Sequence, residues 1–300
     1  MTYNKEFIEC MVETSTAQLC VRTREGVGTP IVLISGGPGM PDYLQPVARL
    51  LGRYKTVTYD QRGTGASKAT NGRYDVDAHI ADLEAIRRHL GVEQIHLFGH
   101  SWGGLLAQLY ATAHPQQVAS LFLCSPSTGA GRDWVAMEQA VMQYNRRQST
   151  AWQFALLGLW SLLAQLPGQV GQRALQRMYN QVWQNYQRTA TPVPADPRIL
   201  SGVGPAATFQ TRASIVKLPA GMLASVLPAA SIPLYITFGE HDIYGLFIED
   251  VRKRYPQATI EIHGNCGHLP WLDCPELFQE KLTDFYGQVM AGVTTRHQER

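Results

Sequence analysis

The six residues Gly99-His100-Ser101-Trp102-Gly103-Gly104 organise this chain. They follow the apolar run Ile95 to Phe98 and precede a segment rich in Leu and Ala, which predicts a strand before them and a helix after them. Strand, Gly-x-Ser-x-Gly and helix in succession are typical of a nucleophile elbow, a turn so tight that residues beside the serine must lack a bulky side chain. We therefore expect Ser101 to be a nucleophile, with its hydroxyl above the end of a sheet and near the positive end of the following helix.

A second glycine-rich turn follows the β-branched run 30–34, which is typical of a strand buried on both faces. Its sequence is Ser35-Gly36-Gly37-Pro38-Gly39, in which the glycines let the backbone turn sharply and approach a ligand. In hydrolases with a nucleophile elbow, the loop at this place supplies one amide of the oxyanion hole. We assign that amide to Gly37 and the second amide to Trp102.

A serine hydroxyl needs a base that is itself oriented by a carboxylate, and in this type of fold the chain order is serine, acid, histidine. Asp242 follows the apolar run 233–238, and His268 follows the last apolar run, so both stand at strand ends as Ser101 does. We predict Asp242 as the acid and His268 as the base. Glu240 and His263 are the alternatives, but each lies close against its strand, where reaching the site is harder.

Apolar strands alternate with helical segments up to about residue 126, which favours a mostly parallel sheet covered on both faces. The alternation then breaks, and the chain is helical and irregular until about residue 230, where it resumes. We therefore expect an α/β fold with a core made of residues 1–126 and 231–300, and a helical cap made of residues 127–230. Of the eight large aromatic side chains that we note in the cap, we expect about one in four to line a pocket.

The local patterns also predict the individual elements. The expected strands are 7–12, 17–22, 30–34, 56–59, 95–98, 118–124, 233–238 and 258–262. The expected helices are 75–90, 105–111, 134–147, 150–166, 169–188, 247–254 and 275–290. We expect the polar tail from Thr294 to Arg300 to be frayed.

The composition of the 300 residues excludes several function classes. A formal net charge of +2 gives no support to binding of nucleic acid or a membrane surface, and no apolar run is long enough for a transmembrane helix. The N-terminus lacks the apolar core of a secretory signal, so we expect a cytoplasmic protein. The loop 60–67 has neither dinucleotide-binding spacing nor a phosphate-binding lysine, so we expect no nucleotide cofactor, and we expect Asp60 and Arg62 to brace this loop.

The five cysteines are odd in number and lack metal-ligand spacing, so we expect reduced thiols and no metal. Cys10 and Cys20 could face each other on an N-terminal hairpin. Cys266 stands two residues before His268, where a reactive thiol is one interpretation and a passive neighbour is the one we favour.

Several blocks together resemble the α/β-hydrolase superfamily and, within it, the prolyl aminopeptidase (proline iminopeptidase) family. The matching blocks are Gly36-Gly37-Pro38-Gly39, Asp60-Gln61-Arg62-Gly63-Thr64-Gly65-Ala66-Ser67, Gly99-His100-Ser101-Trp102-Gly103-Gly104, Gly239-Glu240-His241-Asp242 and Gly267-His268. The resemblance implies an α/β-hydrolase fold with a helical cap, a serine hydrolase without cofactor, and release of an N-terminal residue from short peptides. It carries over the triad as Ser101, Asp242 and His268, and the oxyanion amides as Gly37 and Trp102.

Two features depart from that family. Ser35 stands where the family usually has histidine before Gly-Gly-Pro-Gly. The family binds the substrate ammonium through cap glutamates, yet residues 127–230 contain only three acids, Asp133, Glu138 and Asp196, against nine Arg and Lys residues. The prediction is therefore a serine hydrolase of a small amide or ester, with an esterase or lactonase that lacks aminopeptidase activity as the alternative. A non-catalytic binding protein is a weaker alternative. The expected ligand is a small molecule or a short peptide.

Overall fold

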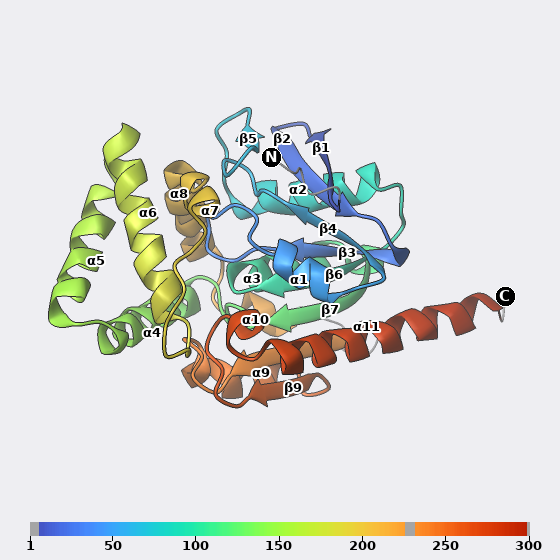
Figure 1. Cartoon of the computed structure of the whole chain (residues 1–300). Helices are drawn as coiled ribbons and strands as arrows, with labels where there is room; N and C mark the ends of the chain where they lie inside the picture. The colour runs from blue at the N-terminus through green and yellow to red at the C-terminus, as the bar shows by residue number, and fades with distance from the viewer. Residues whose placement is uncertain (1–5, 226–231, 299–300) are drawn as a thin grey trace.

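A nine-stranded sheet forms the centre of the computed structural model, which describes residues 6–225 and 232–298 (Figure 1). The strand order is β1-β2-β4-β3-β6-β7-β8-β9, and β5 pairs with β2 at one side. All neighbours from β4 to β9 are parallel, whereas β2 pairs antiparallel with β1, β4 and β5. The strands are β1 Ile8–Glu13, β2 Ala17–Arg24, β3 Val27–Ile34, β4 Tyr54–Tyr59, β5 Lys68–Ala69, β6 Ile95–His100, β7 Val118–Cys124, β8 Leu234–Gly239 and β9 Thr259–His263.

Helices cover both faces of this sheet, as the continuous apolar strands predict. In β3, Val32 and Ile34 contribute to the core under α2 and α3, whereas Ile31 and Leu33 contribute to the core under α1 and α11. The helices of this core are α1 Gln45–Leu50, α2 Val76–His89, α3 Trp102–Ala113, α9 Ile248–Arg254, α10 Pro270–Asp273 and α11 Pro275–Gln298, with 3-10 turns η1 Pro115–Gln117 and η3 Gly245–Phe247. The mostly parallel, doubly covered sheet is thus confirmed.

Between β7 and β8, the described residues form five helices, and Figure 1 shows α5 and α6 at one side of the molecule, away from the sheet. They are α4 Arg132–Gln148, α5 Ala151–Leu163, α6 Gly168–Asn185, α7 Pro197–Ser201 and α8 Pro205–Lys217, followed by the 3-10 turn η2 Met222–Ser225. The sequence patterns predicted no separate element at α1, α7, α8, α10 or β5. The division at residues 126 and 230 stays a prediction, and its second boundary lies outside the described residues.

Element ends follow from local capping. The side chain of Asp75 accepts a hydrogen bond from the N–H of Ala78 and starts α2, and Thr150 with Gln153 forms a capping box that starts α5. One expectation is wrong: α11 continues to Gln298, so residues 294–298 are helical rather than frayed, and residues 299–300 lie outside the description. None of the described helices is long and apolar enough to cross a membrane.

The N-terminal hairpin keeps Cys10 and Cys20 apart. Cys10 stands opposite Val21 and Cys20 opposite Met11, so the two thiols are offset by one residue. Because successive side chains of a strand point to opposite faces, this offset sends the two thiols to different faces of the sheet. Both cysteines are free thiols.

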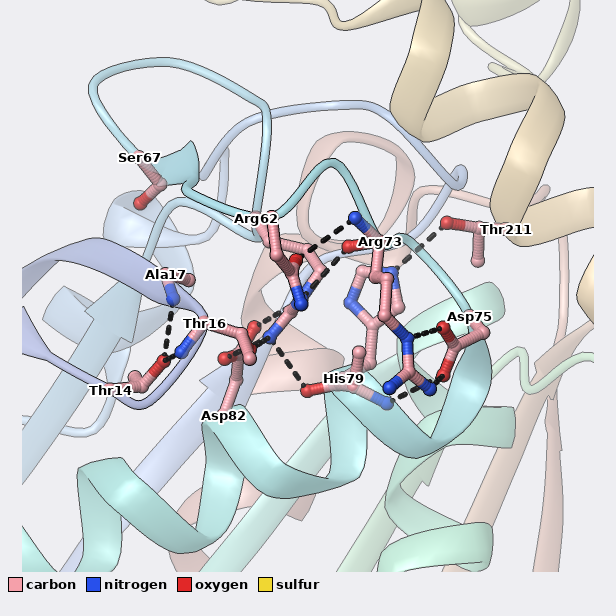
Figure 2. Close-up of polar contacts among 12 residues, drawn as sticks. Thr14, Thr16, Ala17, Arg62, Ser67, Arg73, Asp75, His79, Asp82 and Thr211 are labelled. Atoms are coloured by element: carbon pink, nitrogen blue, oxygen red, sulfur yellow. Dashed lines mark hydrogen bonds and ion pairs between the residues drawn. The ribbon is translucent and has the colours of Figure 1, made fainter.

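Arg62 braces the loop after β4, as expected (Figure 2). Its guanidinium pairs with the carboxylate of Asp82 in α2 at 2.6 and 2.7 Å, and neither side chain is more than 1% exposed. It also donates to the backbone oxygens of Arg73 and Ala78, at 2.8 and 3.0 Å. All three guanidinium nitrogens of Arg62 therefore have polar partners, which a buried guanidinium requires.

Candidate active site

Ser101 occupies the tight turn between β6 and α3. Its backbone has φ 55° and ψ −121°, a left-handed conformation that is strained for a residue with a side chain. A Cβ at Gly103 would lie 2.1 Å from the carbonyl oxygen of Ile34, so only glycine allows α3 to start this close to β3. The structure thus has the elbow backbone that the motif predicts.

Asp242 and His268 meet beyond the ends of β8 and β9. The Nδ1 atom of His268 lies 3.1 Å from Oδ1 of Asp242, and the backbone N–H of Tyr244 donates to the same oxygen at 2.9 Å. Both side chains are at most 2% exposed. Because the N–H at Nδ1 donates a hydrogen bond to the carboxylate, Nε2 of His268 is left to accept a proton.

The two alternatives from the sequence lie elsewhere. Glu240 accepts a hydrogen bond from the backbone N–H of Asn265 at 3.0 Å on the exposed side of the loop. His263 is buried, with Nε2 3.0 Å from the hydroxyl of Thr237. Neither residue lines the cavity that contains Ser101 and His268.

The hydroxyl of Ser101 contacts Tyr244, which sequence reasoning missed. Ser101 Oγ lies 3.3 Å from Tyr244 Oη, and Ser127 Oγ lies 2.9 Å from the same oxygen. Burial raises the pKa of Tyr244 to about 12, so it is a neutral hydroxyl. Ser101 makes no hydrogen bond with His268 in this conformation, although both residues line one cavity. The only sequence signal for Tyr244 is its position two residues after Asp242.

The glycine-rich loop after β3 lies against the nucleophile. A Cβ at Gly36 would come within 2.6 Å of the Cβ of Ser101. The backbone N–H groups of Gly37 and Trp102 donate no hydrogen bond to any residue in the described part of the chain, and both residues line the cavity beside Ser101. These two donors are therefore available to an oxygen atom bound there.

Gln61 links the elbow to this loop, and sequence analysis assigned it no role. The indole Nε1–H of Trp102 donates to Gln61 Oε1 at 2.9 Å, and Gln61 Nε2 donates to the carbonyl oxygen of Ser35 at 2.7 Å. All three residues are buried. The side-chain amide thus holds the two backbone segments that carry the free N–H groups in one relative position.

A second chain of hydrogen bonds runs through His100. The N–H of Gly36 donates to Tyr43 Oη at 2.6 Å, and the tyrosine hydroxyl donates to His100 Nδ1, also at 2.6 Å, because the other ring nitrogen faces a carbonyl oxygen and must carry the proton. The remaining nitrogen of His100, Nε2, then donates to the carbonyl oxygen of His268 at 2.9 Å. Burial holds the pKa of His100 well below its usual value, which agrees with this neutral tautomer.

A cavity of about 680 Å³ lies beside Ser101 and His268. Helices α4, α5, α6 and α8 contribute most of its lining, which is largely apolar. Five of the eight cap aromatics line it, more than the expected one in four: Trp134, Phe154, Tyr179, Trp183 and Tyr186. The large aromatic side chains of these helices therefore lie mostly toward the cavity rather than between the helices.

One cap acid enters the cavity, and it is paired. Glu138 of α4 and Arg212 of α8 both line the cavity, and they form two hydrogen bonds of 2.5 and 2.6 Å. Two nitrogens of the Arg212 guanidinium each donate to one oxygen of the Glu138 carboxylate, which is a bidentate geometry between opposite charges. Glu138 is the only carboxylate among the described residues that line the cavity, and its charge is compensated.

One group of potential metal ligands lies outside the cavity. The side chains of His263, Cys266 and Cys274 place their ligand atoms within 4.8 Å of one another. The two sulfur atoms, however, lie 2.7 Å apart. Two thiolates on one tetrahedral Zn²⁺, each about 2.3 Å from the metal, stand about 3.8 Å apart, so this spacing does not fit a zinc site.

Comparison with known proteins agrees with this architecture. A family model described as the alpha/beta hydrolase fold matches residues 29–196. The proline iminopeptidase of Lactobacillus delbrueckii subsp. lactis is 28% identical over 276 residues, which cover 85% of this chain and 89% of that protein. Among solved structures, the proline iminopeptidase of Mycobacterium smegmatis has a TM-score of 0.65 at 20% identity, covering 95% of this chain and all (100%) of that chain.

An N-acyl homoserine lactonase has a TM-score of 0.70 at 18% identity, covering 94% of this chain and 97% of that chain. At this low identity the structural likeness concerns the fold. The matches confirm the resemblance inferred from the motifs and the prediction of a hydrolase. By its sheet, its elbow and its match to the family model, this chain belongs to the α/β-hydrolase fold family.

Proposed function

We propose that the protein is a serine hydrolase that acts through an acyl-enzyme at Ser101. The observation that carries this proposal is the hydrogen bond between His268 Nδ1 and Asp242 Oδ1, in one cavity with the Ser101 elbow. The cytoplasmic location predicted from the N-terminal sequence and a small-molecule or short-peptide substrate belong to the same proposal.

The proposed reaction begins when the Ser101 hydroxyl turns from Tyr244 toward His268 Nε2. The oxygen attacks the substrate carbonyl carbon while the proton passes to the imidazole, which Asp242 stabilises as the cation. The N–H groups of Gly37 and Trp102 bind the negative oxygen that forms. His268 then protonates the leaving group, and a water molecule, deprotonated by the same imidazole, hydrolyses the acyl-enzyme.

The lining of the cavity favours an uncharged, apolar acyl group, carried by an ester. The Glu138–Arg212 pair leaves no uncompensated carboxylate there to bind a substrate ammonium. An ester also needs less protonation of its leaving group than an amide does, so it tolerates looser positioning. Aminopeptidase activity is the second candidate, because Glu138 does reach the cavity and because the curated relative is a proline iminopeptidase.

The test compares hydrolysis of p-nitrophenyl acetate and butyrate with hydrolysis of proline p-nitroanilide. We expect the two esters to be the better substrates by kcat/KM, and a fluorophosphonate probe to label the wild-type protein. Ser101→Ala is expected to lose the label and to lose kcat by about 10⁴-fold or more. A better rate on the anilide would favour the aminopeptidase.

A matched control is available in the core. Ser120 is another buried serine, with its hydroxyl 2.7 Å from Nδ1 of His96, but it does not line the cavity. Ser120→Ala is expected to keep the label. Absence of labelling in the folded wild-type protein would refute serine catalysis and leave a binding protein.

A further inference from the structure

Two thiols flank the loop that carries His268. Cys266 lies between β9 and this histidine, and Cys274 ends α10 six residues after it. Their sulfur atoms are 2.7 Å apart, and the sulfur of Cys274 is 3.8 Å from Nδ1 of His263. Cys266 is fully buried, whereas Cys274 is partly exposed. The catalytic reaction proposed above uses neither thiol.

Backbone contacts hold the two thiols together. The carboxylate of Asp273 accepts hydrogen bonds from the N–H of Gly267 at 2.8 Å and the N–H of Arg188 at 2.9 Å. The carbonyl oxygen of Cys266 accepts from the N–H of His241, and the N–H of Cys274 donates to Pro270, both at 2.9 Å. Both ends of the loop are therefore fixed, which keeps the backbones of the two cysteines close to each other.

The surroundings make the two thiols chemically different. The hydrogen bond from the Cys266 thiol, together with the one from His263, lowers the pKa of Cys274 to about 6 despite its partial burial. The same hydrogen bond and burial raise the pKa of Cys266. Because Cys274 is also the more exposed of the two cysteines, an oxidant reaches it first, and Cys266 lies buried behind it.

We propose that Cys274 and Cys266 form a peroxide-reactive dithiol, which closes to an intramolecular disulfide around the loop that carries His268. In the first step the Cys274 thiolate attacks an oxygen of a hydroperoxide, the O–O bond breaks, a sulfenic acid forms, and the hydroxide or alkoxide that leaves takes a proton from solvent to become water or alcohol. In the second step the sulfur of Cys266 attacks the sulfenyl sulfur, the S–O bond breaks, and hydroxide leaves with the Cys266 proton as water. Two thiols thus lose two electrons to one peroxide.

The test treats the full chain with hydrogen peroxide, removes the excess with catalase, and alkylates the denatured protein with N-ethylmaleimide. Residues 255–281 form one tryptic peptide that contains both cysteines. We expect this peptide to change from two labels to none with the loss of two hydrogens, and reduction before alkylation to restore both labels. Retention of both labels, or a loss that reduction does not reverse, would overturn the proposal.

Cys10 provides an internal control, because it is partly exposed and lies 3.7 Å from Nε2 of His89, but it has no thiol contact among the described residues. We expect Cys10 to keep its label at peroxide doses that close the pair. Cys266→Ser is expected to leave a sulfenic acid on Cys274 that dimedone traps, and Cys274→Ser to leave Cys266 alkylatable. Stoichiometric zinc in the purified wild-type protein that is lost in Cys274→Ser would overturn the proposal in favour of a metal site.

Discussion

At the scale of single residues, buried neutral side chains link the backbone segments around one serine. Tyr43 and His100 connect the glycine-rich loop to the backbone of His268 through hydrogen bonds of 2.6 and 2.9 Å. Gln61 connects the same loop to Trp102. Such bonds between buried groups restrict the positions of the groups that we expect to react.

Asp242→Asn is expected to lower kcat for p-nitrophenyl ester hydrolysis by about 10⁴-fold, because an amide in this place favours the wrong tautomer of His268. The fold is expected to remain intact, as circular dichroism would show. Glu240→Gln is the matched control, since the contacts of Glu240, with the backbone N–H of Asn265 and with the side chain of His241, lie on the exposed side. A similar loss in both variants would contradict the assignment of Asp242.

Arg212→Gln is expected to raise the ratio of kcat/KM for proline p-nitroanilide to that for the ester, because it frees the Glu138 carboxylate to bind an ammonium. A rise of about tenfold corresponds to about 1.4 kcal/mol of additional binding. Glu138→Gln is expected to lower the same ratio. Unchanged ratios in both variants would show that this pair takes no part in substrate selection.

At the scale of secondary-structure elements, long-range polar contacts join the core to the cap. Figure 2 shows Arg62 between the turn at Thr14–Ala17 and the first turns of α2, with His79 of α2 reaching Thr211 of α8. The hydroxyl of Thr211 donates to the carbonyl oxygen of Tyr74, so it accepts the proton of His79 Nε2. One helix therefore orients both the loop after β4 and a cap helix.

Arg62→Met is expected to lower the free energy of unfolding by about 3–5 kcal/mol, because it leaves the buried Asp82 carboxylate without its cation. Urea denaturation monitored by tryptophan fluorescence measures this loss. Replacing Asp82 by Leu in the same chain is expected to recover part of it, since no unpaired charge then remains.

Arg73→Ala is the control for that variant. Arg73 forms a similar bidentate pair with Asp75, shown beside Arg62 in Figure 2, but its side chain is 61% exposed. Solvent screening makes such a pair contribute little, so we expect a much smaller loss than for Arg62→Met. Equal losses would refute the burial argument.

At the scale of the whole molecule, the fold contains buried histidines that are neutral. Burial lowers the pKa of His79 to about 3 and that of His96 to about 4. In the unfolded chain a histidine titrates near 6.5 and binds a proton that the folded chain excludes. Their contribution to stability is therefore complete above pH 6.5 and decreases as the pH falls toward these folded-state values.

Between pH 6 and pH 4.5, each of these histidines is expected to remove up to about 1.4 kcal/mol of unfolding free energy per pH unit. Urea denaturation across this range measures the slope. His96→Gln is expected to reduce the slope by about that amount for one group. An unchanged slope would mean that His96 binds its proton equally in both states.

Much of the fold and part of the site could be predicted from local sequence patterns. The apolar run 118–124 predicts β7 with its observed bounds, and the elbow around Ser101 has the expected strand, turn and helix, because the residues that form each of them are neighbours in the chain. The helices α1, α7, α8 and α10 were missed because each has a proline in its first turn, in sequence that local rules read as a loop.

By itself, the sequence determined the sheet, the elbow and the residues at the strand ends, since glycines and apolar runs act on their own backbone. Only the tertiary structure decided which side chains meet: Tyr244 at Ser101, Glu138 with Arg212, and Cys266 with Cys274. The partners in the first two contacts are separated by 143 and 74 residues. Their meeting depends on how the cap and the loops pack on the sheet, and no local pattern encodes that packing.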